Sequence, residues 1–164
     1  MELSVTQENF ARALSIVGRV ASNRTGLPIL SNILLRTDGT RLLVAATNLE
    51  IAATCYVGAK VVRQGDITLP ARLVSDYVGS LPKGTIELSS KGTSMTISSG
   101  NYSSIMTGVD ATEFPELPSI DEKQAVTYTI AEADFKQAIS QTIITTSNDT
   151  SRPVLTGVYW HTDG

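Results

Sequence analysis

The stretch VTYTIAEADFKQAISQTIITTSNDTSRPVLTGVYWHTDG (126–164) repeats the pattern of MELSVTQENFARALSIVGRVASNRTGLPILSNILLRTDG (1–39). The two stretches align without a gap at a shift of 125 residues, and 11 of the 39 aligned pairs are identical. Unrelated stretches of this length would share roughly two or three identical pairs. The identical pairs are Phe10/Phe135, Ala13/Ala138, Ser15/Ser140, Ser22/Ser147, Asn23/Asn148, Thr25/Thr150, Pro28/Pro153, Leu30/Leu155, Thr37/Thr162, Asp38/Asp163 and Gly39/Gly164. A period this long indicates a duplicated domain and not a solenoid repeat of about 20–50 residues.

The boundary between the two copies falls in an acidic segment, 110–123, that contains two prolines. This composition predicts an extended linker, and we expect Phe114 in it to pack against a neighbouring domain. Residues 1–122 are then a complete first domain and residues 123–164 the start of a truncated second one. The sequence stops at Asp163-Gly164, whose counterpart Asp38-Gly39 is predicted to turn between two strands. We therefore expect a fragment of a longer protein.

Hydrophobic periodicity divides the first copy into two successive strand–helix–three-strand (βαβββ) units. The first unit has a helix from a Thr6 cap to about Ala21, and strands are expected at 2–5, 31–37, 41–47 and 51–62. The second has a helix that begins at Pro70, and strands are expected at 66–69, 85–89, 94–98 and 102–109. The second copy restarts the pattern with a strand at 126–130, a helix around Phe135 and a strand at 158–161. The predicted fold class is α+β.

Composition restricts the class of protein. With 41% hydrophobic and 18% charged residues the chain is globular, and its net charge of −3 gives no overall attraction to nucleic acid. A single cysteine, Cys55, excludes an internal disulfide and fits a reducing compartment. Since the N-terminus lacks a signal-peptide pattern and no apolar run reaches the roughly 20 residues that span a bilayer, we expect a cytoplasmic protein without a membrane contact.

Five collinear motifs give the chain a family resemblance. They are LPILSNILLRTDG (27–39), TNLEI (47–51), DITLPAR (66–72), LPKG (81–84) and ATEFPELP (111–118). Together with the duplication, they resemble the bacterial sliding clamps, the beta subunits of DNA polymerase III. The resemblance implies the DNA-clamp fold, in which tandem βαβββ units place helices on the inner face of a ring and antiparallel sheets outside.

What the resemblance implies about function is a processivity factor of DNA replication. Two subunits, each with three such domains, close head to tail around duplex DNA and hold DNA polymerase III. The expected partners are duplex DNA, the polymerase, clamp loader subunits and a second copy. No catalytic residue, cofactor or metal is expected.

The polar helix faces carry the expected DNA contacts. Opposite the apolar stripes lie Arg12 and Arg19 in the first helix, Arg72 in the second and Lys136 in the third, with Asp76 as an opposing charge. The inner surface of a clamp should be basic enough to tolerate phosphates but make no tight contacts with base edges. Each of these residues could also belong to an ordinary solvated helix face, and it is the pattern across three helices that favours the inner surface. The resemblance adds Arg24, Asn148 and Arg152 from the loops.

Two contacts with proteins are implied by the resemblance alone. Leu155 matches a residue of the family's peptide-binding pocket, although its repeat partner Leu30 also allows a plain core role. The strand containing Tyr102, Ser104 and Met106 matches the edge that pairs with the partner subunit.

Two other classes of protein remain open at this point. One is a non-enzymatic α+β scaffold whose duplicated domain binds a protein through a sheet edge. The other is a hydrolase that uses Cys55 and His161 as nucleophile and base, although both residues fall in predicted strands. Neither a Cys/His cluster with metal-ligand spacing nor a glycine-rich phosphate loop occurs in the sequence.

Overall fold

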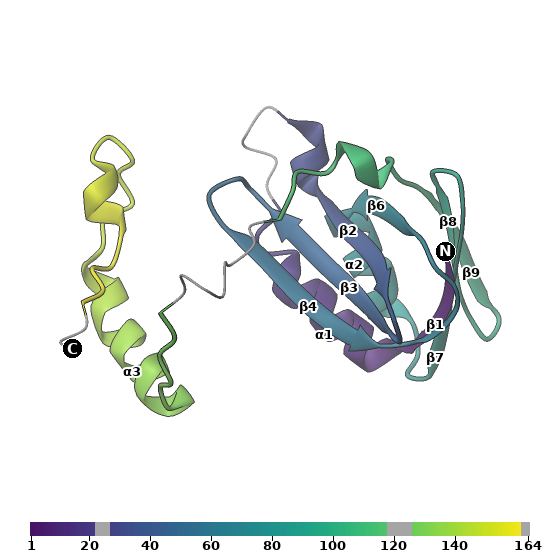
Figure 1. Ribbon diagram of the computed structural model, residues 1–164, viewed down its shortest axis with the longest axis horizontal. Helices are drawn as coiled ribbons and strands as arrows, with labels where there is room; N and C mark the ends of the chain where they lie inside the picture. Colours follow the sequence, from purple (N-terminus) through teal and green to yellow (C-terminus); the bar gives the residue numbers. More distant parts are fainter. Residues whose placement is uncertain (22–26, 118–125, 162–164) are drawn as a thin grey trace. The chain divides into compact units, whose positions relative to one another are not determined.

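The computed structural model describes residues 1–21, 27–117 and 126–161 (Figure 1). It divides the chain into two compact units, Met1–Ser119 and Ile120–Gly164, called unit 1 and unit 2 below. The predicted fold class is confirmed, because helices pack on antiparallel sheets in unit 1. Arg24 lies outside the described residues.

Unit 1 contains the two predicted βαβββ units. The elements of the first are β1 (Glu2–Thr6), α1 (Gln7–Val17), β2 (Asn32–Asp38), β3 (Arg41–Thr47), β4 (Ala52–Gly58) and β5 (Lys60–Arg63). The elements of the second are β6 (Asp66–Pro70), α2 (Ala71–Ser80), β7 (Thr85–Lys91), β8 (Ser94–Ser99) and β9 (Tyr102–Thr107). A 3₁₀ helix, η1 (Pro28–Ser31), precedes β2.

The two βαβββ units within unit 1 exchange their first strands. One sheet has the order β5-β1-β7-β8-β9 and the other β4-β3-β2-β6, with every pair antiparallel. β1 therefore pairs with β7 of the second unit, and β6 pairs with β2 of the first. Neither βαβββ unit can complete its sheet without the other. The whole of unit 1 must therefore fold as one body.

The strand expected at 51–62 is two strands in two different sheets. β4 pairs with β3, and β5 pairs with β1 across the molecule. The chain crosses at Ala59, whose N–H donates to the Thr40 carbonyl at 2.9 Å. Residues on both sides favour strand structure equally, so local propensity gave no sign of the crossing.

Three two-residue hairpin loops begin with a glycine in the left-handed region. Gly39, Gly92 and Gly100 each have φ +57°, and Leu49 is the only non-glycine with positive φ among the described residues. A glycine at positive φ followed by a residue at negative φ is the pattern of a type II′ turn, whose twist suits a hairpin. The turn predicted at Asp38-Gly39 is one of the three.

The main core lies between the two sheets and both helices. It contains Phe10, Leu14 and Val17 of α1 and Val74 and Val78 of α2, all fully buried. Figure 1 shows α1 and α2 on the same side of the sheets. Burial of the apolar helix stripes thus turns the opposite, polar stripes to solvent.

The helix ends differ from the sequence-based expectation. α1 ends at Val17 and not near Ala21, and the Thr6 side chain makes no capping hydrogen bond. Instead, the N–H of Gln7 donates to the Gly84 carbonyl at 2.8 Å, so a tertiary contact satisfies this end of the helix. Pro70 is the last residue of β6 and precedes the first residue of α2.

A strap, residues 110–117, covers the outer face of the second sheet. Phe114 is buried there against Leu34, Leu43 and Ala45 of unit 1, which confirms that it packs on a domain next to this segment. The strap starts with the 3₁₀ helix η2 (Ala111–Glu113), whose cap Asp110 accepts hydrogen bonds from the Thr112 N–H and hydroxyl. These two bonds lower the pKa of Asp110. The predicted linker therefore belongs to the packed part of unit 1 as far as residue 117.

Unit 2 contains helices but no strand in its described part. α3 (Glu132–Thr142) confirms the predicted helix, and two 3₁₀ helices follow, η3 (Ile143–Thr145) and η4 (Pro153–Thr156). The strands expected at 126–130 and 158–161 are absent. Phe135 and Trp160 contact each other with ring centroids 5.6 Å apart, while most apolar side chains of the unit stay exposed.

Candidate nucleic-acid interface

The polar faces of α1 and α2 form one surface, because the two helices pack directly against each other. Arg12 and Ser15 are exposed on α1, Arg19 is exposed in the turn that follows this helix, and Arg72 is exposed at the start of α2. The structure thus brings three predicted DNA-binding residues of unit 1 onto one face.

The charges of this face are mostly uncompensated. Among the described residues, no carboxylate lies within 4.0 Å of Arg12 or Arg19. The carboxylate of Glu8, one turn before Arg12, forms an ion pair with Lys83, whose Nζ lies 2.6 Å from Glu8 Oε1. This contact lowers the pKa of Glu8. Arg72 differs, since its Nε lies 3.6 Å from a carboxylate oxygen of Asp76.

A shallow cleft of about 380 Å³ runs between the two helices. Its walls carry the guanidinium groups of Arg19 and Arg72 and the hydroxyls of Ser15, Ser31 and Ser75. Ser31 was missed from the sequence, where it was assigned to the start of a strand. It ends η1 instead, and its hydroxyl donates to the Pro28 carbonyl at 2.7 Å. Cationic and hydroxyl donors with no buried carboxylate suit phosphate oxygens.

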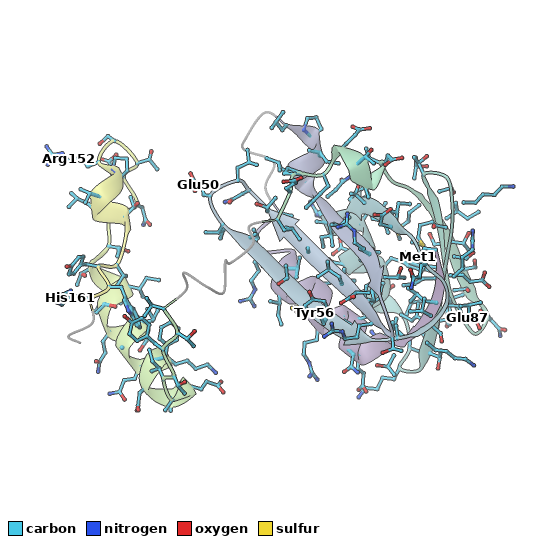
Figure 2. The ribbon with its side chains drawn as sticks, in the orientation of Figure 1. Met1, Glu50, Tyr56, Glu87, Arg152 and His161 are labelled. Atoms are coloured by element: carbon cyan, nitrogen blue, oxygen red, sulfur yellow. The ribbon has the colours of Figure 1, made fainter. Side chains whose placement is uncertain are left out.

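The predicted DNA-binding residues of unit 2 are all exposed. Lys136 forms an ion pair with Glu132 one turn earlier in α3. Asn148 and Arg152 lie in the turn before η4, and Figure 2 shows Arg152 at that turn. The Asp149 carboxylate between them accepts the N–H of Ser151 at 2.9 Å, and this bond lowers its pKa. By the repeat, Asp149 occupies the position of Arg24, so the charge at this position is opposite in the two copies.

β9 lies at the edge of its sheet and has β8 as its single partner strand in the described part of the chain. The N–H of Gly108 donates to the Thr93 carbonyl at 2.7 Å. Since antiparallel bonding alternates, Tyr102, Ser104 and Met106 bond to β8 through their backbones. The neighbouring residues, 103, 105 and 107, turn their N–H and carbonyl groups to the open edge. The Met106 side chain is buried in the core.

The other sequence-based candidates are scattered. Leu155 is half exposed in η4. Cys55 lies on β4 in unit 1, whereas His161 lies in unit 2, where its ring stacks on Tyr159. No group of three potential metal ligands occurs among the described residues. None of the helices there is long and apolar enough to cross a bilayer.

Comparison with known sequences shows a family match over most of the chain. Residues 1–118 match the family described as the N-terminal domain of the DNA polymerase III beta subunit. The beta sliding clamp of Synechococcus elongatus is 35% identical over 164 residues, which cover 97% of this chain and 43% of that protein. The beta sliding clamp of Bacillus subtilis is 30% identical, with 98% of this chain and 44% of that protein covered.

Solved structures give the same result for the fold. The polymerase III beta subunit of Caulobacter crescentus superposes with a TM-score of 0.90 at 28% identity and covers 100% of this chain. The match takes in 44% of the Caulobacter chain. The present chain therefore spans less than half the length of the proteins that it resembles.

Proposed function

Since the chain belongs to the DNA polymerase III beta subunit family, the bacterial sliding clamps, we propose that it is the N-terminal part of a DNA replication processivity factor. In this proposal the whole protein forms a ring around duplex DNA in the cytoplasm and tethers the polymerase. It carries out no reaction of its own. Residues 1–122 supply the first domain and residues 123–164 the start of the second.

The observation that carries the proposal is the shared polar face of α1 and α2. It presents Arg19 and Arg72 together with serine residues around an open cleft, and Arg12 is exposed on α1 outside that cleft. A sliding protein needs contacts with phosphates that are easily exchanged, and it needs few contacts with base edges. Long, exposed arginine side chains beside small hydroxyl residues meet this need. Arg24, Lys136, Asn148 and Arg152 are proposed as further contacts.

Protein partners are proposed at two other places. The open backbone edge of β9 offers hydrogen bonds to a strand of a second subunit, which would give a head-to-tail homodimer. Leu155 is proposed to form part of a pocket for peptides of the polymerase and clamp loader subunits. Its half-exposed side chain leaves it available for an apolar contact.

Binding to duplex DNA tests the proposal. We expect the 164-residue chain to bind two duplexes of unrelated sequence with similar, weak affinity in fluorescence anisotropy at low salt. Three substitutions test the face: Arg12→Ala, Arg19→Ala and Arg72→Ala. Each should lower the affinity for the two duplexes by the same factor. Arg12→Ala and Arg19→Ala should each reduce the slope of log K against log salt by about 0.9, the value for one lost phosphate contact. Arg72→Ala should reduce it by less, because Arg72 also pairs with Asp76.

Arg41→Ala provides the matched control, because it removes the same charge from the β2–β3 hairpin. Arg41 pairs there with Asp38 at 2.8 Å and stacks over Tyr56. It should leave DNA affinity nearly unchanged. A loss as large as that of Arg19→Ala would refute the assignment of the helix face. A strong preference for one of the two duplexes would contradict a sliding function.

A further inference from the structure

Arg72 and Asp76 are arranged against the preferences of an isolated helix. Arg72 stands in the first turn of α2, where the helix dipole favours an acidic residue, and this turn contains none. The pair also runs with the cation first, which is the less stabilising order for residues four apart. Helix stability therefore does not explain why these two charges stand where they do.

The ion pair in α3 shows the contrast. Glu132 lies in the first turn and Lys136 follows four residues later, so the dipole and the residue order are both favourable. This pair fits a simple stabilising role. The Arg72–Asp76 pair instead stands at the interhelical cleft, because Arg72 is one of the residues that line it.

We propose that Asp76 is a positioning residue that limits how tightly Arg72 holds a DNA phosphate. This inference rests on the proposed function and adds a regulation of the same surface. Asp76 attracts the Nε side of the Arg72 guanidinium along the helix, and a phosphate must compete with Asp76 for that side of the group. Because the side chains are 95% and 73% exposed, the pair is weak and exchanges easily.

Arg72 differs from the other two arginines of the face because it has a carboxylate partner. Arg12 and Arg19 have no carboxylate competitor within 4.0 Å among the described residues, so they bind phosphate without first losing a partner. Arg72 makes a contact that is readily exchanged. A surface with such a contact would hold DNA without fixing it at one position, as sliding requires.

The test is the DNA affinity of Asp76→Asn in the 164-residue chain. We expect an affinity about two- to five-fold higher than that of the parent at low salt, the range that corresponds to an exposed ion pair. The salt slope should become steeper by up to about 0.9 as Arg72 gains a full phosphate contact. Asp76→Glu keeps a carboxylate four residues from Arg72 and should restore the parent affinity and slope.

Two controls separate this role from general charge effects. Glu50→Gln changes the net charge equally at the β3–β4 corner, which Figure 2 labels, and should have no such effect. In an Arg72→Ala background, Asp76→Asn should lose most of its effect. Equal effects of Asp76→Asn and Glu50→Gln, or a full effect without Arg72, would overturn the inference. Absence of DNA binding by the parent and every variant would overturn the proposed function and this inference together.

Discussion

Residues 1–39 and 126–164 share a sequence pattern but only part of a structure. The helices agree residue for residue, since α1 (Gln7–Val17) and α3 (Glu132–Thr142) have the same bounds at the shift of 125. The 3₁₀ helices η1 and η4 agree in the same way. The strands do not, because β1 and β2 have no counterpart in the described part of unit 2.

The difference separates local from non-local structure. A helix closes its hydrogen bonds within four residues, so each copy can form it alone. A strand needs neighbours, and β1 and β2 find theirs in β3, β5, β6 and β7. Those partners lie within residues 41–91, and the second copy has no equivalent of them in this sequence. The apolar side chains follow the strands: Phe10 is 0% exposed and its counterpart Phe135 is 43% exposed.

The largest expected effect comes from truncating this phenylalanine in each copy. Phe10→Ala should lower the free energy of unfolding of unit 1 by about 3–5 kcal/mol, because it leaves a cavity in the main core. Phe135→Ala should change it by less than about 0.5 kcal/mol, as expected for an exposed site. Urea unfolding followed by far-UV circular dichroism measures both changes.

The single tryptophan, Trp160, reports on unit 2 separately, since it contacts Phe135. Its fluorescence should respond to Phe135→Ala and not to Phe10→Ala at low urea. If Phe135→Ala lost as much sheet signal as Phe10→Ala, the two copies would contribute equally to the folded sheets.

A smaller effect is expected in the strap. Phe114→Ala should destabilise unit 1 by about 2–4 kcal/mol, because the ring is buried against β2 and β3. Ile144→Ala, in the exposed part of unit 2, should leave the melting temperature of unit 1 unchanged. Thermal unfolding by circular dichroism decides between a packed strap and the linker expected from composition. An unchanged melting temperature in Phe114→Ala would support the linker.

The smallest effect concerns acid stability. Folding lowers the pKa of Glu8 from 4.5, through its hydrogen bond to Lys83. The carboxylate form is therefore favoured in the folded state, and the resulting stability is present above pH 4.5 and lost as the pH falls through the lowered value. Glu8→Gln should make the stability of unit 1 less dependent on pH in that acid range.

Asp149→Asn is the comparison from unit 2, where the pKa of Asp149 is also lowered. It should leave the acid unfolding of unit 1 unchanged, since the bond that this carboxylate accepts from Ser151 lies within its own turn. Urea midpoints measured between pH 3 and pH 6, roughly the range in which carboxylates titrate, compare the two variants. Parallel profiles for the parent and Glu8→Gln would show that the Lys83 bond contributes nothing.

Sequence patterns predicted what depends on neighbouring residues and missed what depends on distant ones. Glycine turns and the apolar stripes of the helices were predicted correctly, because both follow from local geometry. The crossing at Ala59 and the place of Phe114 on the outer face of the second sheet were not, since each is decided by a sheet that forms elsewhere in the chain. Of the site, the arginines were visible as a polar helix face. The Arg72–Asp76 pair and the position of Ser31 in the cleft needed coordinates.

Amide hydrogen exchange tests most directly the claim that strands form only where their partners are present. The account predicts slow exchange throughout β1 and β2 of unit 1, limited by global unfolding. Residues 129–130 and 158–160 should exchange at nearly the rate of an unstructured peptide, and α3 should be intermediate. Protection at 129–130 and 158–160 equal to that of β1 and β2, in a dilute sample, would contradict it.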